Sequence, residues 1–124
     1  MAEVTIGTMA APAETAINRV EIETGLSIAH YDARFLKPLD EVLLHQIGKK
    51  FKKIITIEDG TTEGGFGSAV LEFMAENDYK AEIIRMGIPD SFIEHGTPDE
   101  LYASIGLSTE GIEKKINEMI RVEE

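Results

Sequence analysis

A short apolar run near the middle of the chain, Ile54-Ile-Thr-Ile57, constrains the fold more than any other stretch. A half-exposed strand would alternate apolar and polar residues, whereas this nearly continuous apolar run is typical of a strand buried on both faces of a parallel sheet. Parallel strands need crossover connections, which are usually helices. The run therefore predicts a sheet with helices on both sides.

Three further strands are expected at residues 4–7, 26–29 and 81–86, and helical patterns separate them. Helices are expected after Pro12, Asp40, Gly64, Thr97 and Ser108. Strands that alternate with helices predict an α/β fold with three layers, α/β/α, whose mainly parallel sheet has about four strands. Residues 1–124 are expected to form this one domain.

Capping signals and helical periodicity locate the ends and inner faces of these helices. Asp40 and Ser108 are suited to accept from free N–H groups at helix starts, and Gly25 is suited to end a helix. Thr97-Pro-Asp-Glu100 has the form of a capping box with proline in the first turn. The apolar positions at helical spacing are Ala13, Ala16, Ile17, Val20, Val42, Leu43, Leu44, Ile47, Phe66, Ala69, Val70, Phe73, Met74, Ile112, Ile116, Met119 and Ile120.

Composition excludes several classes of function. The chain has 23 Asp and Glu against 12 Lys and Arg, and its net charge of −11 opposes binding to the phosphates of nucleic acids. It has no cysteine, so disulfides, thiol catalysis and cysteine-based metal sites are excluded. No run approaches the ~18 apolar residues of a membrane span, and no signal peptide is visible, so a cytoplasmic location is expected.

A group of glycines lies between the central strand and the helix after it. Gly60, Gly64, Gly65 and Gly67 could present backbone N–H groups to an anion such as phosphate. Their spacing matches neither the dinucleotide fingerprint nor a P-loop. Close packing of the helix on the sheet would require the same glycines. An anion contact, at Gly64 and Gly65, and a structural role therefore both stay open.

Two carboxylates, Glu58 and Asp59, directly follow the central strand. Such groups can meet a basic residue or accept hydrogen bonds from the N–H groups of a neighbouring helix. A phosphoacceptor role for Asp59 would need an acidic pair after the first strand, and the chain has Gly7-Thr8 there. Capping or an ionic contact is therefore the expected role.

The histidines and serines give no sign of a catalytic or metal site. No two of His30, His45 and His95 are spaced as metal ligands, and the first two are expected to be structural. For His95, which precedes a capped helix, a loop hydrogen bond and proton transfer are both open. Ser68 and Ser104 have no histidine at a recognisable triad spacing. No catalytic residue is assigned.

Three blocks of sequence, in order along nearly the whole chain, carry a resemblance to a known family. They are Asp32-Ala-Arg-Phe-Leu-Lys-Pro-Leu-Asp40, then Thr56-Ile-Glu-Asp-Gly60 with Gly64-Gly-Phe-Gly-Ser-Ala-Val-Leu-Glu72, and then Arg85-Met-Gly-Ile-Pro-Asp90 with Phe92-Ile-Glu-His-Gly-Thr-Pro-Asp-Glu-Leu101. Together they resemble the C-terminal domain of the 1-deoxy-D-xylulose-5-phosphate synthases, which are thiamine diphosphate-dependent enzymes of the transketolase family.

The resemblance implies a fold and a setting for the chain. The fold is that of a transketolase C-terminal domain, with strands in the order 2-1-3-4. The implied enzyme is a cytoplasmic homodimer that joins pyruvate, after decarboxylation, to glyceraldehyde 3-phosphate for isoprenoid, thiamine and pyridoxal synthesis. Thiamine diphosphate and magnesium bind between its other domains, so this chain is expected to hold no cofactor or metal and to be inactive alone. Its expected partners are those domains, and it resembles an excised domain or a separate subunit.

The loop after the second strand is the expected contact with the other domains. Asp32 and Arg34 can pair, because residues two apart share one face of an extended chain. An internal Asp32–Arg34 pair that only shapes the turn is the open alternative to this contact. Phe35 adds apolar bulk whose exposure would be costly without cover. The complete set of candidate interface or anion contacts is Asp32, Arg34, Phe35, Glu58, Asp59, Gly64, Gly65 and His95.

Two other interpretations stay open. A transketolase subunit and a 2-oxo acid dehydrogenase β subunit have a similar signature around Lys37-Pro-Leu-Asp40, although the third block favours the synthases. The chain could also be a free-standing anion-binding or assembly module with no enzymatic partner. Neither interpretation predicts contact with nucleic acid or membrane.

Overall fold

The structure, a computed structural model, describes residues 1–6, 9–32, 41–61, 65–88 and 106–121. In this part of the chain strands alternate with helices, as predicted. The elements are β1 (Ala2–Ile6), α1 (Ala10–Thr24), β2 (Ala29–Asp32), α2 (Glu41–Lys50), β3 (Lys53–Thr61), α3 (Phe66–Glu76), β4 (Glu82–Ile88) and α5 (Thr109–Arg121).

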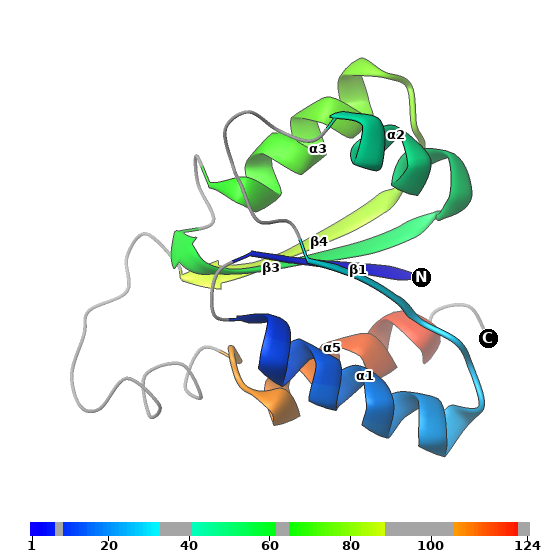
Figure 1. Cartoon of the computed structure of the whole chain (residues 1–124), viewed down its shortest axis with the longest axis vertical. Coiled ribbons are helices and arrows are strands. Elements are labelled where there is room, and N and C mark those ends of the chain that lie inside the picture. Colours follow the sequence, from blue (N-terminus) through cyan, green and yellow to red (C-terminus); the bar gives the residue numbers. More distant parts are fainter. Residues whose placement is uncertain (7–8, 33–40, 62–64, 89–105, 122–124) are drawn as a thin grey trace.

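The four strands form one parallel sheet in the order β2-β1-β3-β4, which confirms the predicted order. Helices α2 and α3 cover one face of the sheet, and α1 and α5 cover the other (Figure 1). The chain leaves β1 for β2 on one side and later returns to place β3 on the other side. The strand order therefore reverses between β1 and β3, which is where open α/β sheets form ligand crevices at the carboxyl ends of their strands.

The central run predicted to be buried on both faces is β3, and its side chains join two separate cores. Ile55 and Ile57 pack with the apolar residues of α1 and α5, whereas Ile54 packs with those of α2 and α3. Thr56 lies on the same face as Ile54 and is also fully buried. This alternation explains why almost every position of the run had to be apolar.

The helical periodicity located the inner faces of α1, α3 and α5 correctly. The buried residues among the predicted positions are Ala13, Ala16, Ile17, Val20, Phe66, Val70, Phe73, Met74, Ile112, Ile116 and Met119. On α2 the pattern was too broad, because Leu44 and Ile47 are buried but Val42 is 71% exposed. A helix of this length buries a single stripe, and residues three apart occupy it.

The second strand lies three residues later than predicted. It was expected at residues 26–29, and β2 is instead Ala29–Asp32. In the sheet Ala2 pairs with Ala29, and Thr5 pairs with Asp32. The earlier stretch is a connection in which Ile28 is buried but Leu26 is 47% exposed, so its apolar residues do not belong to a strand.

Two hydrogen bonds hold that connection out of the sheet. The N–H of Leu26 donates to Thr24 Oγ1 at 3.2 Å, and the N–H of Ile28 donates to Glu21 Oε2 at 2.9 Å. Their donors are therefore directed toward α1 and not toward a neighbouring strand. Ile28 is still buried in the core beside α1, which explains its apolar character.

The predicted ends of α1 and α5 are confirmed. Gly25 ends α1 with φ 74°, a left-handed conformation that favours glycine, and its N–H donates to the carbonyl of Glu21. Ser108 caps α5 through its Oγ, which accepts from the N–H of Gly111 at 3.1 Å. The other end of α5 is tied to the sheet, because Lys53 Nζ donates to the carbonyl of Met119 at 2.6 Å.

Other predictions fall outside the described residues. These are the cap at Asp40, the Gly7-Thr8 turn and the helix after Thr97. Within the described ranges, no helix combines the length and apolar character needed to cross a membrane.

Candidate functional site

The carboxyl end of β3 carries a buried carboxylate that caps the next helix. Glu58 is only 4% exposed. Its Oε1 accepts from the N–H of Phe66 at 3.2 Å, and its Oε2 accepts from the N–H of Gly67 at 2.6 Å. These are the first two residues of α3, whose amides carry the partial positive charge of the helix terminus. Glu58 thus supplies a negative charge where the helix favours one.

This arrangement replaces the usual N-cap. Gly65 occupies the N-cap position of α3 in an extended conformation and has no side chain to accept from the helix, and the first turn contains no acidic residue. The acceptor comes instead from the adjacent strand, eight or nine residues earlier in sequence. A capping contact of this kind contributes on the order of 1–2 kcal/mol, and its charge raises the contribution further.

Gly67 allows α3 to approach the sheet closely. A Cβ at this position would lie 2.6 Å from Thr56 Oγ1 and 3.0 Å from Arg85 Cγ, which is tighter than side chains tolerate. Arg85 extends along the same surface and donates from Nη1 to Ser68 Oγ at 2.9 Å. At Gly67, therefore, the structure supports the packing explanation of the glycine group.

The described residues do not fit a diphosphate–magnesium site. The two amides at the start of α3 already donate to Glu58, whose own charge would repel a diphosphate placed there. Among the described residues no three His, Asp or Glu side chains are grouped as metal ligands would be. At this edge of the sheet, the role of Glu58 is to fix the orientation of α3 relative to β3.

The remaining predicted contacts are only partly within the described residues. Asp32 ends β2 and Asp59 lies in β3, so the two are on opposite sides of β1. Four candidates, Arg34, Phe35, Gly64 and His95, lie outside the described ranges. An Asp32–Arg34 pair and a shared interface therefore stay predictions.

The sequence interpretation missed a second buried carboxyl, Glu3 of β1. Its side chain has no exposed surface, and within the described part of the chain neither of its oxygens has a hydrogen-bond partner. Burial raises the pKa of the Glu3 carboxyl from its usual 4.5 to about 8. The residue was overlooked because the strand was expected to begin at residue 4. A strand that begins at Ala2 puts Glu3 on the same face as Thr5.

The two histidines that the structure describes have structural contacts. His30 lies opposite Glu3 in the sheet, and its Nε2 is 2.9 Å from Thr5 Oγ1. On α2, Nδ1 of His45 is 2.7 Å from the hydroxyl of Tyr79. Both agree with the predicted structural roles.

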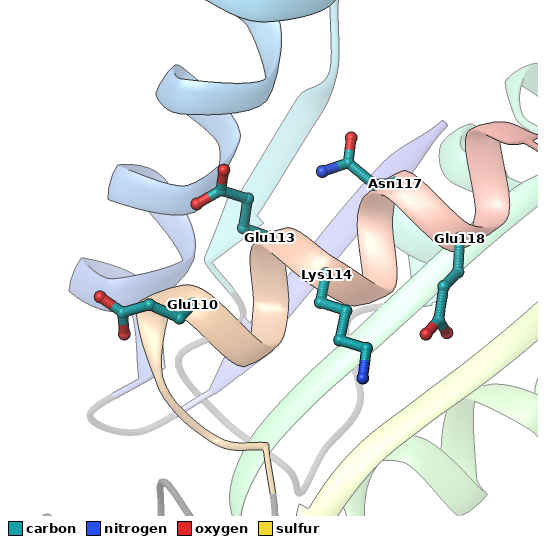
Figure 2. A pocket seen from close by; sticks show the side chains of 5 residues that line it. All are labelled: Glu110, Glu113, Lys114, Asn117 and Glu118. Atoms are coloured by element: carbon teal, nitrogen blue, oxygen red, sulfur yellow. The ribbon is translucent and has the colours of Figure 1, made fainter.

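A shallow hollow of about 300 Å³ on α5 is lined by charged residues but does not form a site. Figure 2 shows its side chains leaving one helix in different directions, so they do not converge on a common point. Three of them are in ion pairs with residues outside the lining: Glu110 and Glu113 each lie 3.6 Å from Arg19 Nη1 of α1, and Glu118 lies 3.2 Å from Lys115 Nζ. Lys114, Asn117 and Glu118 complete the lining.

Comparison with protein families agrees with this geometry. The family model for the C-terminal domain of transketolase matches residues 3–112. The chain belongs to this family. Its fold and the three sequence blocks are accordingly those of a transketolase C-terminal domain, and the predicted resemblance to the corresponding domain of the synthases is confirmed.

Individual relatives place the chain more closely within the transketolase C-terminal family. It is 58% identical over 116 residues to a 1-deoxy-D-xylulose-5-phosphate synthase of Bacteroides fragilis and 56% identical over 114 residues to that of Phocaeicola vulgatus, covering 94% and 92% of this chain. The Bacillus mycoides synthase is 45% identical over 117 residues. In each case the match covers 18% of the relative, so this chain spans less than a fifth of their length.

A solved structure supports the same assignment. A split-gene transketolase, described as an inactive β4 tetramer, superposes with a TM-score of 0.84 at 31% identity. The match covers 94% of this chain and 38% of that chain. A transketolase C-terminal domain therefore adopts the same fold beside a larger remainder of its polypeptide.

Proposed function

We propose that this chain is the C-terminal domain of a thiamine diphosphate-dependent 1-deoxy-D-xylulose-5-phosphate synthase, in which it supports assembly and takes no part in catalysis. The observation that carries the proposal is its identity of 56–58% with two such synthases over more than nine-tenths of the chain. The identity of 31% with the split-gene transketolase is much lower, which favours a synthase over a transketolase subunit.

The proposed enzyme converts pyruvate and glyceraldehyde 3-phosphate to 1-deoxy-D-xylulose 5-phosphate and CO2. In it, thiamine diphosphate and magnesium bind to domains outside this chain, and the enzyme is a cytoplasmic homodimer. The described residues support this division, because the start of α3 is already capped by Glu58 and is not open to a diphosphate. The role left to this domain is to hold the other domains in position.

The proposed contact with those domains is the carboxyl edge of the sheet. Asp32 and Asp59 lie on strands that end there, and open α/β sheets present their binding surfaces at this edge. Arg34, Phe35 and His95 belong to the same proposed surface by their place in sequence. The surface would be covered in the enzyme and exposed in this chain alone.

The proposal is tested with the whole enzyme and with this chain in parallel. The enzyme that contains this domain is expected to form deoxyxylulose phosphate from the two substrates, and the chain alone is expected to form none. Titration calorimetry with thiamine diphosphate and magnesium should give no heat of binding for the chain and saturable binding for the enzyme. Micromolar binding by the chain alone would contradict a purely supporting role.

A further inference from the structure

An open hollow of about 390 Å³ lies between the C-terminal end of α2 and the turn that joins α3 to β4. Four lysines and two aromatic rings line it: Lys49, Lys50, Lys52, Lys80, Phe51 and Tyr79. We call this surface the lysine hollow. It lies where β3 and β4 begin, at the opposite end of the sheet from the Glu58 cap.

The two rings form a fixed apolar floor. Tyr79 is half-buried, and its hydroxyl is hydrogen-bonded to His45. Its ring also packs closely on α2, because a Cβ added at Gly48 would lie 2.5 Å from Tyr79 Cδ2. Phe51 is also half-buried and packs edge to face against Tyr31, with centroids 6.2 Å apart. These contacts with His45, Gly48 and Tyr31 fix the positions of both rings, so the surfaces that face the hollow need no rearrangement to receive a ligand.

The rim is strongly basic on a chain that is strongly acidic. Among the described residues, the hollow is lined by four of the chain's 12 Lys and Arg residues but by only one, Asp78, of its 23 Asp and Glu residues. All four lysines are exposed, and among the described residues none of them makes an ion pair.

Helix ends explain only part of this charge. Lys49 and Lys50 are in the last turn of α2, where they complement the negative end of the helix. Lys50 Nζ also lies 5.5 Å from the centroid of the Phe51 ring. Lys52 and Lys80, however, lie outside the helices, so capping does not explain their presence beside the same two rings.

We propose that the lysine hollow binds an acidic polypeptide segment that carries an aromatic or aliphatic side chain. Its carboxylates would pair with the flexible ammonium groups, and its apolar side chain would rest on Phe51 and Tyr79. We assign the segment to the part of the synthase outside this chain, since the chain spans only 18% of the length of related synthases. In this respect the inference rests on the proposed function.

Other anions fit the hollow less well. Helices α2 and α3 both end here, so they direct carbonyl groups and not N–H groups toward a bound anion. Among the described residues the lining contains no arginine, whose guanidinium could bind a phosphate through two hydrogen bonds. A nucleic acid would extend beyond the hollow over a chain whose net charge is −11, which opposes contact with its phosphates. A short acidic segment avoids both difficulties.

The first test uses a fluorescently labelled synthetic peptide in which two acidic residues lie on each side of one phenylalanine. Its anisotropy is measured with this chain, with the double variant Lys52→Glu/Lys80→Glu, and with Lys114→Glu/Lys115→Glu on α5 as a control of equal charge change. Binding should be saturable, should weaken with salt, and should fall at least ~10-fold in the first variant but less than ~2-fold in the control. Replacing the phenylalanine by serine should also weaken it.

Several outcomes would overturn the proposal. They are no saturable binding of the peptide, equal losses in the two double variants, or tighter binding of inorganic phosphate or a single-stranded oligonucleotide at the same hollow. Circular dichroism of each variant verifies that it is folded. Lys52→Gln/Lys80→Gln, which removes the charges without reversing them, should give an intermediate loss.

The second test identifies the source of the segment. The whole synthase is treated with a carbodiimide, which activates a carboxylate so that a lysine amine in contact with it forms an amide while the reagent leaves as a urea. Its peptides are then mapped by mass spectrometry. Lys52 and Lys80 should couple to Asp or Glu outside this domain. An active synthase without such coupling would refute the assigned partner and leave the proposed function intact, whereas coupling in an enzyme without synthase activity would refute the function alone.

Discussion

Two buried glutamates of the same sheet differ in whether hydrogen-bond donors surround their carboxyl groups. Glu58, at the end of β3, receives hydrogen bonds from two N–H groups at the start of α3. Glu3, on β1, is buried just as deeply but has no hydrogen-bond partner among the described residues. The first orients a helix, while the second is held in its uncharged form by burial, with a pKa of about 8.

The difference shows that burial alone does not determine what a carboxyl group contributes to stability. A buried carboxylate becomes favourable only when donors replace the water it has lost. At the end of β3 the helix amides are such donors, and they need an acceptor as much as Glu58 needs them. On β1 the neighbouring backbone groups are committed to the two adjacent strands, so none is left for Glu3.

The largest expected effect is the pH dependence that Glu3 imposes on stability. The unfolded chain loses this proton near pH 4.5, whereas the folded chain keeps it until about pH 8. Folding therefore takes up a proton between these values, and the free energy of unfolding should fall by about 1.4 kcal/mol for each pH unit as the pH rises through this window. Glu3→Gln cannot ionise, so this contribution should vanish, and the variant should be about 3 kcal/mol more stable than the parent chain at pH 7.

Urea denaturation from pH 4.5 to 8.5 measures this effect, with Glu14→Gln on the exposed face of α1 as the control for the same substitution. The difference between Glu3→Gln and the parent chain should grow with pH. A constant difference would mean that Glu3 is ionised in the folded chain and has found a partner.

The next largest effect is expected at Glu58. Glu58→Ala leaves two buried N–H groups at the start of α3 without their acceptor, and it should lower the free energy of unfolding by about 3 kcal/mol. Glu58→Gln keeps one carbonyl acceptor and should lower it by about 1–2 kcal/mol. Chemical denaturation at pH 7 measures both, with the exposed Glu72→Ala of the same helix as the control. Equal denaturation midpoints for Glu58→Ala and Glu72→Ala would show that the cap contributes nothing.

The smallest effect is expected for two buried threonine hydroxyls, which differ, as the two glutamates do, in whether they have a hydrogen-bond partner. Thr5 has His30 as its partner, whereas Thr56 Oγ1 has none among the described residues. Thr5→Val should lower the free energy of unfolding by about 1 kcal/mol, and Thr56→Val should leave it unchanged or raise it by up to about 1 kcal/mol. Thermal unfolding of the two variants measures this difference in stability. Equal losses of stability would show that the His30 partner of Thr5 contributes nothing.

Local patterns predicted most of the fold correctly. The apolar run of β3, the glycine that ends α1 and the serine that caps α5 each record a requirement that neighbouring residues impose, so they are visible in sequence. The strand order followed from three family blocks and agrees with the structure. The position of β2 did not follow, because Ile28 is as apolar as a strand residue while its N–H donates to Glu21.

The candidate site was less visible in sequence. Glu58 was predicted as a possible cap, but which N–H groups donate to it, those of Phe66 and Gly67, depends on how α3 lies across the sheet. Glu3 was missed because its burial depends on strands from two other parts of the chain. The lysines between residues 49 and 53 are evident in the sequence. The hollow is also lined by Tyr79 and Lys80, which lie in the turn between α3 and β4 and are distant in sequence.

The sequence by itself determined where strands and helices alternate, which helix faces are apolar and to which family the chain is related. These properties depend on residues within a few positions of one another, or on motifs that survive as strings. Only the tertiary structure decided which buried carboxyl group has donors, which lysines share a surface and which glycine must be small. Those properties depend on distances between residues far apart in the chain, and the packing of helices on the sheet sets these distances.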